Sequence, residues 1–197
     1  DIALKKRVEA LNFCFHEILD ILDEPLGEKF YRVRVFDSVE VERKFETGAI
    51  LENLRSAFNV GNIFRSADGF GLGSLSLAGI SPRPPSLKIE RTAMGTVESV
   101  DWSYYQQATD AVKGYREKGY RIYAVETVED AVPLSSIKSF EKTAFIFGNE
   151  EFGISDEALA AADQAVRIPL VGKKNSMNVA NVFAVVMYRA MESLLES

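Results

Sequence analysis

Residues 168–182 read IPLVGKKNSMNVANV, and this stretch decides the fold that we expect for the chain. The apolar run at its start is typical of a strand, and the glycine, lysines and polar residues that follow predict a loop. A helix that opens at Asn178 leaves its first N–H groups without partners inside the helix, and Ser176 and Asn178 are residue types that satisfy such groups. Taken alone, the stretch predicts a strand, a polar loop and a capped helix.

Two other stretches have the same form, in which polar residues and glycine follow an apolar run. Residues 147–153 read FGNEEFG, and residues 59–65 read NVGNIFR. From Gly48 onward, short apolar runs alternate with helical stretches, which is typical of βα units and of a mostly parallel sheet with helices on both faces. Ligands of such sheets bind where loops leave the carboxyl ends of strands, so we expect the three polar clusters to share one edge.

The expected elements alternate along the chain. Strands are predicted at Ala49–Leu54, Ser74–Ala78, Arg121–Val125, Thr143–Phe147 and Ala165–Leu170. Helices are predicted at Val60–Phe70, Thr109–Lys118, Ser155–Ala162 and Asn178–Leu195, with a short one at Ser86–Thr92. No internal repeat and no linker interrupts this region, which predicts one sheet domain over residues 48–197.

Residues 1–47 are expected to form an N-terminal extension. Its apolar residues recur at spacings of four and three, which places them on one face of a helix: Leu4, Val8, Leu11, Phe15, Ile18 and Leu22. That amphipathic helix packs either on its own domain or against a partner subunit. Residues 30–41 fit a short helix and strands equally well.

Composition narrows the classes of function. The 197 residues carry a net charge of −6, which argues against nonspecific coating of nucleic acid, because that role needs a basic face. No apolar run approaches the roughly 20 residues of a membrane span and no signal-peptide pattern opens the chain, so we expect a cytoplasmic protein without a membrane partner. The lone Cys14 and the lone His16 provide neither a Ser-His-Asp triad nor a Cys/His zinc site, and no metal is expected.

Together the three clusters resemble the three sequence motifs of the SpoU family of RNA ribose methyltransferases, within the SPOUT class. The resemblance runs from Ala49 to the C-terminus. The residues that carry it are Asn59, Gly61, Arg65, Ala67 and Gly71 in the first motif, Gly148, Glu150 and Gly153 in the second, and Ile168, Pro169, Gly172, Ser176, Asn178 and Val179 in the third. Each fragment is weak alone, but their order and separation are specific.

The resemblance implies an α/β fold with a deep C-terminal trefoil knot, which residue patterns cannot predict because true knots are so rare. It also implies S-adenosyl-L-methionine (AdoMet) as cofactor, bound against the knot, and tRNA or rRNA as substrate. A homodimer built through the C-terminal helix and the knot region is implied as well. The wide apolar surface of residues 178–195 fits that role and fits a core helix equally.

The implied reaction transfers the AdoMet methyl group to a ribose 2′-hydroxyl. A site for it must hold both groups in line and stabilise the negative charge that develops on the oxygen. By similarity, catalysis is assigned to five polar residues: Arg65, Asn59, Glu150, Ser176 and Asn178. The cofactor pocket is assigned to Gly148, Ile168 and Met177, with Val125 and Thr127 beside them.

Arg65 is the residue that we expect to be essential for transfer. A guanidinium is effectively always protonated in proteins. Stabilisation of the incipient alkoxide, or a bidentate contact with the neighbouring phosphate, therefore suits Arg65 better than removal of the hydroxyl proton. The structural alternative is a surface arginine that pairs with Asp68 or Glu150.

Two other functions remain open. Gly69, Gly71 and Gly73 could belong to the loop of a dinucleotide-binding enzyme, but their spacing does not match G-x-G-x-x-G, and we expect them to end a helix. The other alternative is a knotted protein that binds RNA or assists assembly without catalysis. The joint presence of Arg65, Glu150 and the third-motif residues argues against it.

Overall fold

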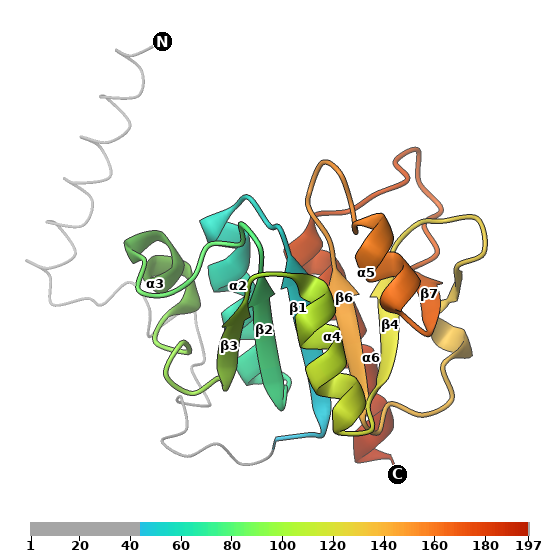
Figure 1. Cartoon of the computed structure of the whole chain (residues 1–197), viewed down its shortest axis with the longest axis horizontal. Helices are drawn as coiled ribbons and strands as arrows, with labels where there is room; N and C mark the ends of the chain where they lie inside the picture. Colours follow the sequence, from blue (N-terminus) through green and yellow to red (C-terminus); the bar gives the residue numbers. More distant parts are fainter. Residues whose placement is uncertain (1–43, 197) are drawn as a thin grey trace, which may run out of the picture. The chain divides into compact units, whose positions relative to one another are not determined.

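The computed structural model describes residues 44–196, and within them the strands form one seven-stranded sheet (Figure 1). Every strand pair is parallel, and the order across the sheet is β3-β2-β1-β6-β4-β7-β5. The strands are β1 (Thr47–Glu52), β2 (Ser74–Ala78), β3 (Trp102–Tyr105), β4 (Arg121–Val125), β5 (Val132–Pro133), β6 (Thr143–Phe147) and β7 (Gln164–Arg167). The predicted α/β class with a parallel sheet is confirmed.

Helices cover both faces of the sheet, as predicted. They are α2 (Ala57–Gly69), α3 (Leu87–Ala93), α4 (Ala108–Glu117), α5 (Asp156–Ala161) and α6 (Val179–Leu195), with a 3-10 turn at Leu134–Ser136. Figure 1 shows α4 and α5 in front of the sheet and α2 and α6 behind it. Side chains alternate between faces along a strand, so β6 contributes to two cores. Phe145 and Phe147 pack with α2 and α6, whereas Ala144 and Ile146 pack with α4 and α5.

The strands predicted at residues 74–78, 121–125 and 143–147 are confirmed to the residue. The prediction Ala49–Leu54 was wrong by two residues at each end. The strand begins at Thr47, which pairs with Thr143, and it ends at Glu52 because Asn53 adopts a φ of 54° and turns the chain out of the sheet. The predicted strand Ala165–Leu170 ends at Arg167 instead. Pro169 has no N–H group for a sheet ladder, which explains the early end.

Capping decides where the two longest helices begin. The helix predicted at Val60 begins at Ala57, because Ser56 caps it and its Oγ accepts a hydrogen bond from the Asn59 backbone N–H over 3.2 Å. The last helix begins at Val179, one residue after the predicted start, because Asn178 is its N-cap and the Asn178 Oδ1 accepts from the Ala180 N–H over 2.9 Å.

The glycines after α2 link a helix to a strand. The helix ends at Gly69, Gly71 follows with a φ of 65°, and β2 begins at Ser74. A dinucleotide-binding loop links a strand to a helix, so that alternative is wrong.

Two edge strands, β3 and β5, were missed. They contain four and two residues, which is too short for a periodic pattern. The predicted N-terminal helix and residues 30–41 lie outside the described residues. Within the described part, no helix is long and apolar enough to cross a membrane, and no three His, Cys, Asp or Glu side chains gather as a metal site would require.

Candidate functional site

A cavity of about 460 Å³ lies where the chain leaves the carboxyl ends of β4, β6 and β7. Its size falls within the range of small-molecule sites. The five predicted cofactor residues all line it: Val125, Thr127, Gly148, Ile168 and Met177. Of the predicted catalytic residues, Glu150, Ser176 and Asn178 line it too. The second and third polar clusters therefore meet at one edge of the sheet, as expected from the parallel topology.

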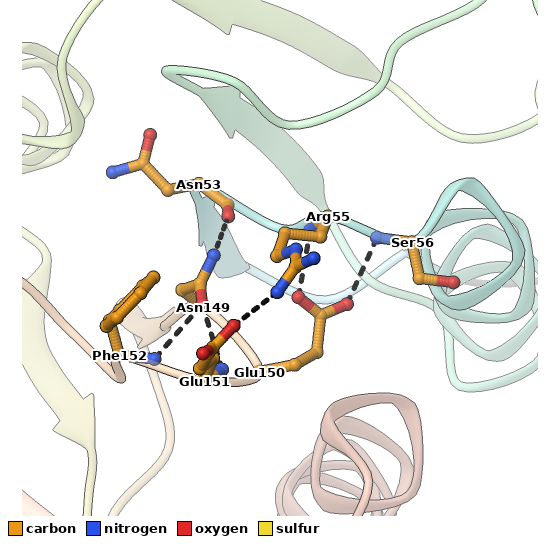
Figure 2. A network of polar contacts seen from close by, with 7 residues as sticks. All are labelled: Asn53, Arg55, Ser56, Asn149, Glu150, Glu151 and Phe152. Atoms are coloured by element: carbon orange, nitrogen blue, oxygen red, sulfur yellow. Dashed lines mark hydrogen bonds and ion pairs between the residues drawn. The ribbon is translucent and has the colours of Figure 1, made fainter.

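The Glu150 carboxylate joins the loop after β6 to the loop between β1 and α2. Its Oε2 accepts a hydrogen bond from the Arg55 N–H over 2.8 Å, and its Oε1 accepts from the Ser56 N–H over 3.2 Å (Figure 2). The side-chain amide of Asn59 donates to Oε1 over 2.8 Å. Because backbone N–H groups at a helix start lack partners inside the helix, a carboxylate is well placed there.

These contacts determine the charge state of Glu150. Partial burial alone would raise the pKa of its carboxyl group. The hydrogen bonds from Arg55, Asn59, Ser56 and its own backbone N–H outweigh that effect, and the pKa lies below the ordinary value. Glu150 is therefore an anionic acceptor at neutral pH and is not suited to donate a proton.

Asn59 connects Glu150 to the third polar cluster. While its amide nitrogen donates to Glu150, its Oδ1 accepts a hydrogen bond from the Asn178 Nδ2 over 3.1 Å. An asparagine side chain can do both because it carries a donor and an acceptor. Two side-chain hydrogen bonds thus join one residue from each of the three clusters.

Arg65 lies outside this network. Its side chain is on the exposed stripe of α2 together with Phe58, Asn62 and Gly69, at spacings of three and four residues. It does not line the cavity, and within residues 44–196 its guanidinium makes no hydrogen bond or ion pair. Neither predicted alternative partner contacts it, since Asp68 accepts from the Ser99 Oγ and Glu150 from the β1–α2 loop.

Ser176 is exposed at the wall of the cavity. Its hydroxyl makes no hydrogen bond to another residue of the described part, so the helix cap is provided by Asn178 alone. The Ser176 hydroxyl is therefore available to a ligand in the cavity.

The motif-two loop, residues 148–155, is built around Asn149, which the sequence analysis missed. Figure 2 shows the Asn149 side chain between two loops: its Nδ2 donates to the Asn53 carbonyl oxygen over 2.6 Å, and its Oδ1 accepts from the N–H groups of Glu151 and Phe152. Arg55 and Glu151 form an ion pair across the same gap. An asparagine that bonds to N–H groups two and three residues onward is an Asx turn, a signal that N-E-E-F-G offers.

Two further carboxylates hold the other end of the motif-two loop. Buried Glu52 accepts from both the N–H and the hydroxyl of Ser155, over 2.9 and 2.6 Å. Glu126, which lines the cavity, accepts from the Ile154 N–H over 3.1 Å. The loop that carries Glu150 is thereby fixed at both ends.

A model described as the SpoU rRNA Methylase family matches residues 47–188. The chain belongs to the SpoU family. The matched region of this SpoU-family protein extends from β1 into α6 and contains the five predicted catalytic residues: Asn59, Arg65, Glu150, Ser176 and Asn178.

Relatives of this SpoU-family protein act on different RNAs. It is 30% identical over 166 residues to the tRNA (guanosine(18)-2′-O)-methyltransferase of Thermus thermophilus, and the match covers 84% of each chain. The A. aeolicus TrmH/SpoU tRNA modifying enzyme has a TM-score of 0.72 at 21% identity and 78% coverage of both chains. The AdoMet-bound rRNA methyltransferase from Sinorhizobium meliloti has a TM-score of 0.70 at 28% identity, covering 77% of this chain and 58% of that one. The predicted RNA 2′-O-methyltransferase family is confirmed.

Proposed function

We propose that this protein transfers a methyl group from AdoMet to a ribose 2′-hydroxyl of tRNA or rRNA. The observation that carries the proposal is the pair of hydrogen bonds from Asn59 to Glu150 and from Asn178 to Asn59, which join the three family motifs beside one cavity. The family match supports the reaction. The related Thermus enzyme is a tRNA methyltransferase and the Sinorhizobium protein is an rRNA methyltransferase, so both RNA classes are candidate substrates.

The residues around the cavity fit AdoMet. The ionisable side chains that line the cavity are three carboxylates and one guanidinium: Glu126, Glu150, Glu151 and Arg167. This excess of negative charge favours a ligand that carries a positive sulfonium. When bound, AdoMet supplies an electrophilic methyl group. We assign its binding to Gly148, Ile168, Met177, Val125 and Thr127.

The other assigned site residues either contact the RNA or fix the loops around the cavity. Glu150 and Asn178 hold Asn59 from two sides, and this network orients the loop that precedes α2. The Ser176 hydroxyl and the Asn178 side chain lie at the cavity wall, where an incoming ribose would be placed. The Arg65 guanidinium, which has no partner within residues 44–196, stabilises the alkoxide that develops on the ribose oxygen or contacts the adjacent phosphate.

We further propose that the C-terminal segment of this protein forms the trefoil knot of the family and that two copies of the protein form a homodimer. In the sheet, β7 lies between β4 and β5, which precede it in the sequence, and this order supports a threaded C-terminal segment. On α6, the side chains of Val185 and Tyr188 are exposed, which supports this helix as a surface for a second copy. Sedimentation of the purified protein tests the dimer, and a monomer at micromolar concentration would contradict it.

The decisive experiment offers tritiated AdoMet to the purified protein with bulk tRNA and, separately, bulk rRNA. We expect label in one of the two, and digestion to nucleosides should place it on a 2′-O-methyl ribose. RNA binding without transfer would instead support the knotted, non-catalytic alternative. Label on a base would contradict the proposed acceptor group.

A further inference from the structure

A stacked arginine–tyrosine pair lies at the carboxyl edge of β2 and β3, outside the cavity. The Cζ of Arg83, in the β2–α3 loop, is 3.9 Å from the centroid of the Tyr104 ring on β3. Neither residue lines the cavity, and both side chains are exposed. We call this pair the Arg83–Tyr104 platform. A guanidinium over an aromatic face is attracted by the ring and keeps its N–H edges open to solvent.

The platform is fixed to the backbone around it. The Tyr104 hydroxyl donates to the Gly79 carbonyl oxygen over 3.0 Å, and the Ile80 N–H donates to the Asn53 Oδ1 over 3.1 Å. Gly79 has a φ of 63°, and a Cβ atom there would lie 1.9 Å from the Asn53 Oδ1. The positive φ favours glycine at position 79, and a side chain there would displace the Asn53 side chain that accepts from Ile80.

Asn53 connects the platform to the motif-two loop. The Asn53 Oδ1 accepts a hydrogen bond from the Ile80 N–H, and the Asn53 backbone oxygen accepts one from the Asn149 Nδ2 over 2.6 Å. Figure 2 shows the Asn53 side chain pointing away from Asn149, so one residue reaches in both directions. Asn149 directly precedes Glu150. A short series of hydrogen bonds thus sets the position of the platform relative to the Glu150 network.

Among the described residues, the Arg83 guanidinium differs from three other arginines because it has no anionic partner. Arg55, Arg116 and Arg189 each form an ion pair with a carboxylate. Within residues 44–196, by contrast, no carboxylate lies within ion-pair distance of Arg83. An arginine that is oriented by stacking and left unpaired presents a rigid fork of N–H donors, which matches the geometry of a phosphate group.

We propose that Arg83, oriented by Tyr104, binds a phosphodiester group of the RNA strand whose ribose enters the cavity. The inference rests on the proposed function in taking RNA as the ligand. Arg83 is then an RNA-binding residue, and the hydrogen bonds through Asn53 hold its phosphate contact at a set place relative to the Glu150 network. It contributes to RNA affinity independently of AdoMet.

The chain offers a matched control for this proposal. Arg121 is also exposed and also lies over a tyrosine, with its Cζ 5.2 Å from the Tyr123 ring centroid. It is the first residue of β4 and therefore lies at the opposite, amino-terminal edge of the sheet. Arg83→Ala and Arg121→Ala remove the same charge from two stacked pairs, one on each edge.

Filter binding of bulk tRNA and of bulk rRNA across a salt titration tests the proposal. For Arg83→Ala we expect RNA affinity to fall by about five- to tenfold and the slope of log K against log salt to shrink by about one. The Km for RNA should rise in proportion, with kcat, AdoMet affinity by calorimetry and Tm unchanged. Arg83→Lys keeps the charge but lacks the planar fork of N–H donors, so its RNA affinity should lie between those of the wild type and Arg83→Ala. Arg121→Ala should match the wild type.

The outcomes separate this inference from the proposed function. If the wild type methylates RNA and Arg83→Ala binds RNA with wild-type affinity and salt slope, the platform proposal is overturned and the proposed function stands. Equal losses in Arg83→Ala and Arg121→Ala would also overturn it, since net charge would explain them. If the protein transfers no methyl group but loses RNA affinity only in Arg83→Ala, the platform stands and the proposed function fails.

Discussion

The Glu150 carboxylate accepts a hydrogen bond of 2.8 Å from the side-chain amide of Asn59, which precedes it by 91 positions in the chain. Asn59 accepts in turn from Asn178, which follows it by 119 positions. Because Glu150 also accepts from the N–H groups of Arg55 and Ser56, it fixes the start of α2 against the motif-two loop. The network explains how one residue from each of three short motifs, far apart in the chain, comes to lie beside the same cavity.

Replacing Glu150 by glutamine should disrupt this network. Glutamine has nearly the same shape, but it is neutral and one of its two terminal atoms is a donor, which would face N–H groups of the β1–α2 loop. We expect Glu150→Gln to lower methyl transfer by more than about tenfold and to lower Tm by a few degrees. Glu46→Gln is the control, because Glu46 lies outside the cavity and loses only an exposed ion pair with Lys142. Equal effects of the two substitutions would contradict a special role for Glu150.

The lowered pKa of Glu150 predicts how stability depends on pH. A carboxyl group whose pKa is lower in the folded state stabilises the fold fully above its unfolded pKa, near the ordinary value of 4.5, and this contribution is lost as pH falls through the folded pKa. The difference in unfolding free energy between wild type and Glu150→Gln should therefore be constant near neutral pH and shrink below about pH 4.5. Urea denaturation at a series of pH values measures it, and a difference that grows as pH falls would refute the assignment.

Gly148 should not tolerate a side chain. A Cβ atom there would lie 2.3 Å from the Gly153 carbonyl carbon and the Ile154 nitrogen, which are backbone atoms of the motif-two loop and cannot rotate away. We expect Gly148→Ala to weaken AdoMet binding by at least about tenfold in calorimetry and to lower Tm. Gly172→Ala, with no atom within 4 Å of the added Cβ, should leave both unchanged. Normal AdoMet affinity in Gly148→Ala would show that the loop does not shape the cofactor site.

Arg65 makes no contact that stability requires. Because its guanidinium is exposed and unpaired within residues 44–196, Arg65→Ala should keep the wild-type Tm and AdoMet affinity. Methyl transfer should nevertheless fall by at least about 100-fold, the usual loss when a charge-stabilising donor is removed. Asn62→Ala, on the same exposed stripe of α2, is the control and should retain activity. Substantial transfer by Arg65→Ala would remove Arg65 from the mechanism.

The sequence predicts five of the seven strands, three of them to the residue, because apolar runs are local patterns. Apolar runs place β2, β4 and β6 correctly, and parallel topology then brings their carboxyl ends to one edge. The Asn178 cap is equally local, since one side chain satisfies an N–H group two residues onward. These predictions need no knowledge of distant partners.

Other features depend on contacts between residues far apart and are not visible in the sequence. Glu52 is a charged residue inside a strand, and only the structure reveals that it binds Ser155, 103 positions later. Asn53 turns the chain with a positive φ and contacts both Ile80 and Asn149, yet nothing in the residues around it indicates either partner. The Arg83–Tyr104 platform likewise joins a loop to an edge strand that is too short to predict.

The most direct test of the central claim is nucleoside analysis after a methyl-transfer reaction. Purified protein, labelled AdoMet and bulk tRNA or rRNA are incubated, and the RNA is digested to nucleosides and separated. We predict that the label elutes as a single 2′-O-methyl nucleoside and that Glu150→Gln greatly reduces it. Absence of label from both RNA pools, or label on a nucleobase, would contradict the account.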